Sequence, residues 1–319
     1  MIIIEKCYSI WKRFKKKVTT KYKAYFTIEG TYTSLLPDKV YLKKKYKSIF
    51  NKELNLKNPK TFNEKMQWIK LYDRNPLYTS LVDKYTVREY VKERIGEEYL
   101  IPLLGVWNSP YDIDFDKLPN QFVLKCNHDS DVFICRDKTK CEVRDKKQSY
   151  RNFDEVKNAL DKRLTTNYYK ANREWPYKNV ERKIICEKYM SNENDRPEID
   201  YKFLCFNGIP KIVRLNSGRF TEQEMLTDHY DMNWEHQVIV FNGEPSAGDI
   251  YQKPKQFDLM IELASRLSKN IPFLRVDFNF WNDSIWFGEL TFFDDAGLAI
   301  IYPEKWDSIL GDCIDLKRK

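Results

Sequence analysis

The feature that most constrains the fold is a hairpin pattern between Leu274 and Thr291. Two segments rich in aromatic and β-branched residues, 274–281 and 285–291, flank the turn-forming residues 282–284. Side chains alternate between the two faces of a strand, so a shift of one residue in the pairing exchanges the faces. The length of the loop therefore decides which polar side chains lie together.

A three-residue loop ending at Ser284 gives the better pattern. It pairs Asp277 with Glu289, whereas a two-residue loop places Asp277 opposite Gly288. One face of the hairpin is then a hydrophobic surface made of Val276, Phe278, Phe280, Trp286 and Leu290. The other face carries Arg275, Asp277, Asn279, Glu289 and Thr291. We therefore expect the carboxylates of Asp277 and Glu289 to lie side by side.

The residue pattern leaves two readings of this polar face open. Adjacent carboxylates repel each other unless they share a cation or a proton. Oxygen ligands on neighbouring strands suit Mg²⁺, which takes one or two carboxylates and completes its shell with phosphate oxygens and water. Arg275 beside them would then bind a transferring phosphoryl group. The other reading is an Arg–Asp–Glu ion-pair ladder, which is common on exposed sheet faces.

The first third of the chain has the pattern of a helical region. Thr61 followed by Glu64 is a capping box, and it predicts a helix that begins there. Residues 77–95 form a second segment with helical spacing, which we expect to be one helix ended by the following glycine. The adjacent residues Asp83 and Lys84 fall inside that helix, where solvated surface is the expectation.

From about residue 99 the pattern changes to strands. Short apolar runs predict strands at 99–106, 121–127, 182–190 and 201–206. Asn207-Gly208 predicts a tight hairpin turn into a further strand. Amphipathic patterns predict helices at 154–169, 255–269 and 306–316. The fold class is therefore α+β, with antiparallel sheets preceded by a helical N-terminal region. We expect the helical region to cover 31–98 and the strand-rich domain to cover 99–319.

Positive charge is concentrated in the first 25 residues. They hold eight lysine and arginine residues against Glu5 alone, and therefore +7 of the net charge of +8. Apolar residues from Ile3 to Tyr25 recur at helical spacing, which predicts a basic amphipathic helix over 1–30. Such a helix suits an anionic membrane surface; alternatively, its apolar stripe packs on the protein body. Because the remaining chain is nearly neutral, we expect no nucleic-acid binding.

Cysteine and histidine usage limits other chemistry. The seven cysteines are odd in number and contain no C-x-x-C pair, so neither a zinc site nor a disulfide framework is expected. Reduced, mostly buried thiols are typical of a cytosolic protein. The three histidines leave little material for a histidine metal site or a Ser-His-Asp triad. No apolar run is long enough to span a bilayer, so we expect a cytoplasmic protein, peripheral at most to the inner face of the membrane.

Several segments carry a resemblance to a known family. The hairpin sequences Arg275-Val-Asp277-Phe and Gly288-Glu289-Leu-Thr291 resemble the metal-binding hairpin of ATP-grasp enzymes. Three upstream segments look like the first phosphate-lysine strand, the adenine hinge and the second phosphate-lysine strand of that family, namely 123–128, 186–190 and 200–203. Further matching segments are 58–65, 173–177 and 206–208. Over roughly residues 40–315 the chain is similar to the TupA-like branch of ATP-grasp proteins.

The resemblance implies an ATP-grasp-like fold that uses ATP and Mg²⁺. It implies metal ligands at Asp277, Glu289 and Thr291, and a catalytic role for Arg275. The nucleotide-binding residues that it implies are Lys125, Glu187, Lys188, Tyr189, Met190, Asp200 and Lys202.

The activity implied by the resemblance is ATP-dependent ligation of a carboxylate to an amine through an acyl phosphate. Its setting would be the assembly of a bacterial surface polysaccharide, such as capsule, lipopolysaccharide or teichuronopeptide. The partners would be a nucleotide and a sugar-acid, amino-acid or glycan substrate. Two alternatives stay open. One is a glycosyltransferase that uses a nucleotide sugar, which is how members are often labelled, and the other is a catalytically degenerate scaffold.

Two segments depart from the family pattern. Where a glycine-rich loop is expected after the first phosphate lysine, the chain has Asp129-Ser-Asp131-Val-Phe133. Glycines let backbone N–H groups close around phosphates, and they carry no charge. Where a small-residue loop is expected after Glu289-Leu-Thr-Phe-Phe, the chain has Asp294-Asp295. Both changes place negative charge where the triphosphate is expected, so ATP binding requires a further cation.

Overall fold

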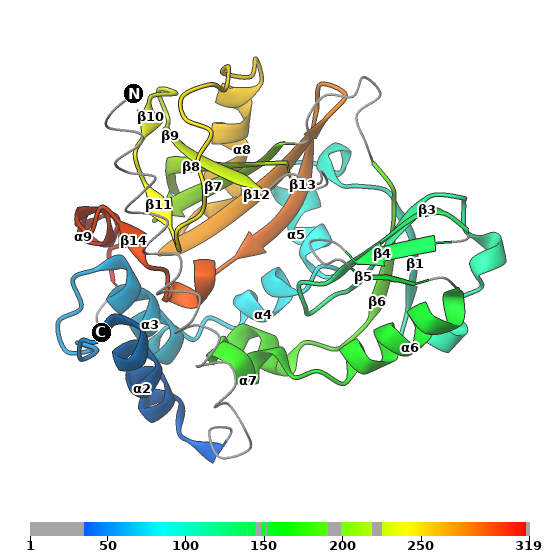
Figure 1. The fold of residues 1–319 in the computed structure, drawn as a ribbon, viewed down its shortest axis with the longest axis horizontal. Helices are drawn as coiled ribbons and strands as arrows, with labels where there is room; N and C mark the ends of the chain where they lie inside the picture. Colours follow the sequence, from blue (N-terminus) through cyan, green and yellow to red (C-terminus); the bar gives the residue numbers. More distant parts are fainter. Residues whose placement is uncertain are drawn as a thin grey trace.

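Two antiparallel sheets carry the fold, and helices cover them (Figure 1). The computed structural model describes residues 35–138, 140–143, 148–150, 152–190, 199–218 and 225–316. The predicted basic helix at 1–30 lies outside these residues. Among these residues, no helix is both long and apolar enough to cross a membrane.

The first sheet has the strand order β1-β6-β2-β3-β4-β5 in the described residues. Its strands are β1 (Leu103–Trp107), β2 (Phe122–Cys126), β3 (Val132–Asp137), β4 (Lys140–Val143), β5 (Gln148–Tyr150) and β6 (Ile184–Lys188). Alternate residues of β2 point into a hydrophobic cluster with α6 (Phe153–Leu164), which covers one face. Phe122 and Leu124 are fully buried there, and the intervening Val123 and Lys125 point to the opposite face.

The second sheet has the order β10-β9-β8-β7-β12-β13 and forms the centre of the molecule in Figure 1. Its strands are β7 (Ile199–Phe206), β8 (Ile209–Ser217), β9 (Leu226–Asp231), β10 (His236–Gln237), β12 (Phe273–Trp281) and β13 (Ser284–Thr291). Helix α8 (Phe257–Ser268) packs on one face of β7, β8 and β12. A short pair of strands, β11 (Val240–Phe241) and β14 (Ile301–Tyr302), lies beside this sheet.

The N-terminal region is helical, as predicted. The other helices are α2 (Asp38–Phe50), α3 (Phe62–Tyr72), α4 (Leu77–Val82), α5 (Val87–Arg94), α7 (Tyr168–Asn172) and α9 (Lys305–Asp312). The 3₁₀ turns are η2 (Glu97–Tyr99), η3 (Pro110–Asp112), η4 (Phe115–Lys117), η5 (Trp175–Asn179) and η6 (Asp294–Gly297). The capping box at Thr61 and Glu64 is present at the start of α3. The prediction of one helix over 77–95 is wrong, because a turn separates α4 from α5.

Helix α3 belongs to the same hydrophobic core as the second sheet. Phe62 is fully buried, and its ring lies 5.0 Å from that of Phe273 and 6.4 Å from that of Phe206 in edge-on geometry. Met66, one turn further along α3, is also fully buried in this cluster. Burying one such side chain contributes roughly 1.5–3 kcal/mol, so residues far apart in the chain stabilise one another directly.

The hairpin β12–β13 has the predicted pairing of Asp277 with Glu289, but between Asp277 and the turn its register differs from the prediction by one residue. Trp281 pairs with Ser284, so the loop is the two residues Asn282 and Asp283, with φ of 49° and 59°. Positive φ at both positions is typical of a type I′ turn. The three-residue loop predicted from sequence is therefore wrong.

A β-bulge at Gly288 restores the pairing of the two carboxylates. Phe278 pairs with Phe287, whereas Asp277 pairs with Glu289, so Gly288 is the extra residue on β13. A Cβ atom at Gly288 would lie 3.0 Å from the Asp277 carbonyl oxygen, tighter than most real contacts. On the turn side of the bulge, the two-residue turn places Phe287 in the core and Trp286 opposite Asn279, so the core face predicted for Trp286 is wrong.

The cysteine prediction also needs correction. Cys135 and Cys141 occupy paired positions on β3 and β4 and form a disulfide in the buried core. Cysteine spacing alone could not indicate this disulfide, because the pairing depends on the register of two strands. Four other cysteines are free thiols, and three of them are buried, namely Cys126, Cys186 and Cys205, with Cys313 partly exposed.

Candidate functional site

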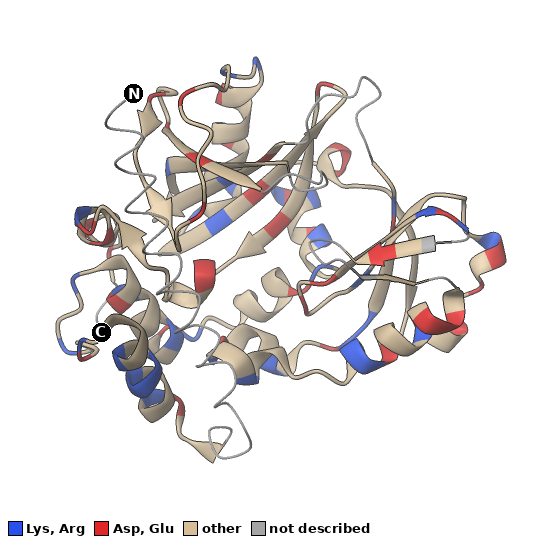
Figure 2. Ribbon diagram, viewed as in Figure 1, with Lys and Arg blue, Asp and Glu red and all other residues tan. Residues whose placement is uncertain are grey.

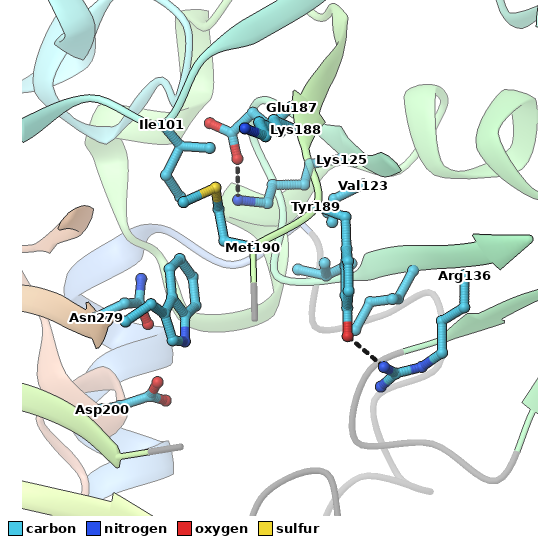
Figure 3. A pocket seen from close by; sticks show the side chains of 13 residues that line it. Ile101, Val123, Lys125, Arg136, Glu187, Lys188, Tyr189, Met190, Asp200 and Asn279 are labelled. Atoms are coloured by element: carbon cyan, nitrogen blue, oxygen red, sulfur yellow. Dashed lines mark hydrogen bonds and ion pairs between the residues drawn. The ribbon is translucent and has the colours of Figure 1, made fainter. Parts of the chain in front are cut away.

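A pocket lies between the two sheets, and the empty space in it, counted together with its opening to solvent, is about 560 Å³ (Figure 3). Apolar side chains such as Ile101, Val123 and Ile134 line it together with a few polar groups. Six residues implicated by the family resemblance line this pocket, namely Lys125, Glu187, Lys188, Tyr189, Met190 and Asp200. An apolar lining with a few convergent polar groups is typical of a small-molecule site.

Charged groups on one wall of the pocket are paired. The Lys125 ammonium donates to Oε2 of Glu187, as Figure 3 shows, and Nη1 of Arg88 lies 3.5 Å from the other carboxylate oxygen. Glu187 is 7 % exposed, so its charge is balanced internally by two cations. Residues 123 and 187 are direct partners in the β2–β6 ladder, which brings these side chains to one face.

The segment after β6 closes another side of the pocket. The backbone N–H of Lys188 donates to the Pro102 carbonyl at 2.9 Å, which fixes the end of β6 against the start of β1. The Arg136 guanidinium lies over the Tyr189 ring, 5.2 Å from the ring centroid. Nη1 of Arg136 also donates a hydrogen bond to the Tyr189 hydroxyl (Figure 3). A flat aromatic surface therefore lies beside the pocket.

The hairpin face brings Asp277, Glu289 and Thr291 together with Arg275. The Arg275 guanidinium donates from Nε to Asp277 Oδ1 at 2.7 Å and from Nη2 to Glu289 Oε1 at 2.8 Å. The Thr291 hydroxyl donates to Glu289 Oε1 at 3.2 Å. Lys202 on the neighbouring strand β7 is the register partner of Asp277 and donates to its Oδ2 at 2.6 Å. Figure 2 shows acidic and basic residues side by side on these strands.

In the structure, the charged residues of this face are therefore joined by ion pairs, which is the second of the two alternatives that the sequence left open. In the described part of the chain, no group of three or more histidine, cysteine, aspartate or glutamate side chains is arranged to hold a metal ion. Asp277 and Glu289 supply two carboxylates, and Thr291 supplies one hydroxyl oxygen. This donor set fits Mg²⁺, which needs only one or two carboxylates when phosphate oxygens and water complete its shell.

The acidic departure at Asp294 is balanced by two arginines inside the protein. The Asp294 side chain is fully buried and accepts hydrogen bonds from Arg275 Nη1 at 2.6 Å and Arg214 Nη2 at 2.8 Å. Burial favours the neutral acid, but the two guanidinium groups outweigh it and hold the pKa of Asp294 below its ordinary value. For Asp295, burial and the charge of Asp294 raise the pKa to about 7.

Residues of α3 hold the loop that carries Asp294. Lys70 is 1 % exposed and donates to the carbonyls of Ala296 at 2.6 Å and Asn172 at 3.0 Å. Burial lowers the pKa of Lys70 to about 7, an effect that the nearby Glu174 carboxylate partly offsets. Gln67 donates to the Gly297 carbonyl at 2.6 Å. The helical N-terminal region therefore fixes the loop next to the hairpin face.

The acidic departure at Asp129 and Asp131 is paired with one arginine that both carboxylates share. Arg163 near the end of α6 lies 2.6 Å from Asp129 Oδ2 through Nε and 3.2 Å from Asp131 Oδ2 through Nη1. The Asp129 side chain is fully buried. Its charge is therefore balanced inside the protein and does not face the pocket as a bare anion.

The sequence reasoning missed the turn between α4 and α5. Asp83 is 4 % exposed, and its Oδ1 accepts hydrogen bonds from the backbone of Tyr85 at 2.8 Å and from Asn127 Nδ2 at 2.8 Å. The expectation of solvated surface is therefore wrong. Lys84 and Arg88 point toward the site from this turn and from α5, with 16 % of each side chain exposed. The preference of aspartate for helix N-termini is the one signal that could have indicated the break.

A model of the family described as TupA-like ATPgrasp matches residues 64–315 of this chain. The chain belongs to the TupA-like ATP-grasp family. The match starts near the beginning of α3 and ends after α9, so it includes both sheets and the site. No curated protein matches the chain in sequence.

Solved structures of ligases show a more distant similarity. D-alanine–D-alanine ligase from Bacillus anthracis, solved with ATP, shares 14 % identity with a TM-score of 0.35, over 66 % of this chain and 53 % of that one. L-amino acid ligase from Bacillus licheniformis shares 11 % identity with a TM-score of 0.42, over 82 % of this chain and 57 % of that one. The chain thus spans little more than half the length of these proteins.

Proposed function

We propose that this chain is an ATP- and Mg²⁺-dependent carboxylate–amine ligase. The supporting observation is a continuous polar row that leads from the pocket to the paired carboxylates. Asp200 and Asn279 are register partners at the pocket, and Lys202 and Asp277 are the next pair on the same face. Glu289 lies beside Asp277 on β13, and Arg275 continues the row away from the pocket. A nucleotide in the pocket would therefore have its phosphates directed toward the carboxylates.

The proposed nucleotide contacts follow from this direction. Tyr189 and Met190 would contact the adenine, with Glu187, Lys188 and Asp200 near the base and ribose. Lys125 and Lys202 would contact the phosphates as point charges. Each of these residues lies on the pocket wall or on the polar row, so one bound molecule can reach them all.

Mg²⁺ would be held by Asp277, Glu289 and Thr291, and when bound it would neutralise phosphate charge and align the terminal phosphoryl group. Arg275 now bridges both carboxylates. Its Nη1 is held by Asp294, so the guanidinium keeps one fixed anchor if its other contacts change.

The proposed chemistry consists of two transfers. A substrate carboxylate oxygen attacks the γ-phosphorus of ATP, the bond to the bridging oxygen breaks, and ADP leaves. The amine nitrogen then attacks the carbonyl carbon of the acyl phosphate, phosphate leaves with the C–O electron pair, and the nitrogen loses a proton. Arg275 would stabilise the charge that develops on the transferring group, because a preorganised guanidinium needs little reorganisation in a water-poor site.

The finer assignments rest on the family resemblance. We propose that the substrates are a sugar acid or amino acid and an amine-bearing glycan intermediate of a bacterial surface polysaccharide. The basic segment 1–25 would hold the enzyme at the inner face of the membrane. We further propose that residues 31–98 form a helical N-terminal region and that residues 99–319 form the ATP-grasp-like domain. Flotation with anionic liposomes, comparing the full chain with a version lacking 1–25, tests the membrane assignment.

Binding and turnover test the proposed activity together. The full chain should be stabilised by ATP with Mg²⁺ in a thermal shift assay, and it should release ADP when a carboxylate and an amine substrate are both present. Asp277→Asn and Glu289→Gln should abolish the metal-dependent part of the stabilisation. Asp283→Asn is the matched control, because Asp283 lies in the exposed turn of the same hairpin.

Two outcomes would contradict the proposal. Stabilisation by a UDP-sugar and not by ATP would favour the glycosyltransferase alternative. An unchanged metal response in the Asp277→Asn and Glu289→Gln variants would remove the hairpin from the site.

A further inference from the structure

The turn between α4 and α5 is fastened to the loop that replaces the glycine-rich loop. The backbone N–H of Lys84 donates to the Asn127 carbonyl at 3.0 Å, and the Asn127 side chain donates to Asp83 at 2.8 Å. Asn127 directly follows β2, the strand that carries Lys125. The backbone of Lys84 is therefore fixed relative to the proposed phosphate site, although it belongs to the helical region.

The Lys84 side chain reaches from this turn to a point between the two sheets. Its ammonium donates to the Asp129 carbonyl at 2.6 Å, in the loop after β2. It also lies 3.9 Å from Oε2 of Glu289 on β13. Lys84 thus approaches a strand of the second sheet while it is anchored on a loop of the first.

The contacts of Lys84 leave its charge available to an anion. Lys84 contacts only the backbone carbonyl of Asp129. The Asp129 carboxylate is paired with Arg163, whose Nε lies 2.6 Å from Oδ2. Among the described residues the ammonium makes one hydrogen bond, and an ammonium has three hydrogens to donate. Glu289 at 3.9 Å is an ion-pair partner beyond hydrogen-bonding distance, and its other oxygen accepts from Arg275.

The loop after β2 has no glycine between residues 127 and 133. Backbone N–H donors from a glycine-rich loop normally surround phosphates because they approach closely and carry positive partial charge. A cation that is bound to this loop and directed at the hairpin can replace them. Lys84 has both properties in this structure.

We propose that Lys84 is a phosphate-binding residue, whose ammonium contacts the terminal phosphoryl group of the nucleotide in place of the missing glycine-rich loop. This inference rests on the proposed nucleotide-dependent function. It adds a contact from outside the strands and hinge that the resemblance implicates. Lys84 would contact the phosphates together with Lys125 and Lys202, from the turn between α4 and α5.

The competing explanation is that Lys84 only stabilises the fold by joining the turn to the loop after β2. Comparing nucleotides with and without terminal phosphates distinguishes this explanation from phosphate binding. The Lys84→Met variant should bind the non-hydrolysable ATP analogue AMPPNP with Mg²⁺ about tenfold to hundredfold more weakly than the wild type, measured by titration calorimetry. Its affinity for AMP should change less than twofold, because AMP lacks the terminal phosphates. Lys84→Arg should retain most of the AMPPNP affinity. Lys92→Met is the matched control, since Lys92 is an exposed lysine of α5.

A labelling experiment on the wild-type chain tests the same contact without a substitution. An acyl-phosphate derivative of ATP transfers its acyl group to lysines beside the phosphates: the amine attacks the acyl carbon, the anhydride bond breaks and ATP leaves. Peptide mass spectrometry should find Lys84 labelled, with protection by ATP and not by AMP. Lys92 should show no nucleotide-dependent labelling.

The outcomes separate this inference from the proposed function. A wild-type chain that binds neither AMPPNP nor AMP would overturn both. A wild-type chain that binds AMPPNP, with Lys84→Met weakening AMPPNP and AMP equally or neither of them, would overturn the role of Lys84 alone. Absence of ATP-protected labelling at Lys84 in a nucleotide-binding chain would do the same.

Discussion

Asp294→Asn should destabilise the protein strongly although it changes a carboxylate to an amide of nearly the same shape. Asp294 is fully buried between the guanidinium groups of Arg275 and Arg214, at 2.6 Å and 2.8 Å. Removing one member of a buried ion pair costs about 3–5 kcal/mol, because the remaining charge stays buried without compensation. Arg275 keeps its contacts with Asp277 and Glu289, so the lower end of about 3 kcal/mol is expected.

Thermal unfolding by circular dichroism measures this effect. At about 2–4 °C per kcal/mol for a chain of this size class, the Tm should fall by about 6–12 °C at pH 7. The pKa of Asp294 is lowered in the folded state, so its contribution is present above the unfolded pKa and is lost as the pH falls through the folded value. The difference between the variant and the wild type should therefore shrink below about pH 4. A Tm change at pH 7 no larger than that of Asp283→Asn would refute the reasoning.

Three further predictions concern the bulge, Asp295 and the disulfide. Gly288→Ala should remove the metal-dependent stabilisation by ATP, because its Cβ would lie 3.0 Å from the Asp277 carbonyl; an unchanged thermal shift would show that the pairing tolerates a side chain. The raised pKa of Asp295 contributes stability that is fully present below the unfolded pKa and is lost as the pH rises through about 7. Asp295→Asn should therefore gain Tm relative to the wild type between pH 5 and pH 8, and a constant difference would contradict this. Alkylation of the denatured, non-reduced chain followed by peptide mapping should leave Cys135 and Cys141 unlabelled, because they are joined; labelling of both would exclude the bond.

Local patterns in the sequence predicted much of the fold. The capping box at Thr61 and the Asn207-Gly208 turn depend on neighbouring residues, and both are present in the structure. The pairing of Asp277 with Glu289 was also predicted, because burying the hydrophobic residues of a hairpin strongly restricts its register. The pocket gathers six residues from segments that the family resemblance had singled out.

Features that depend on long-range contacts could not be predicted in this way. Sequence alone did not show that a two-residue turn and a bulge at Gly288 together replace a three-residue loop, since both give the same carboxylate pairing. The neutralisation of Asp129 by Arg163 joins residues 34 positions apart. The role of Asp83 as a buried acceptor required Asn127 to be near it, 44 positions along the chain. Each of these contacts is set by tertiary packing and not by a local pattern.

The packing of α3 has a consequence for how the molecule unfolds. Phe62 and Met66 share one buried cluster with Phe206 and Phe273 of the second sheet, so loosening α3 would open the interior of that sheet to water. Helix α3 also holds the loop of Asp294 through Lys70. Local melting of the helical region would therefore disturb the hairpin face at the same time. We expect this part of the molecule to lose its structure in a single cooperative transition, with the site failing together with the helices.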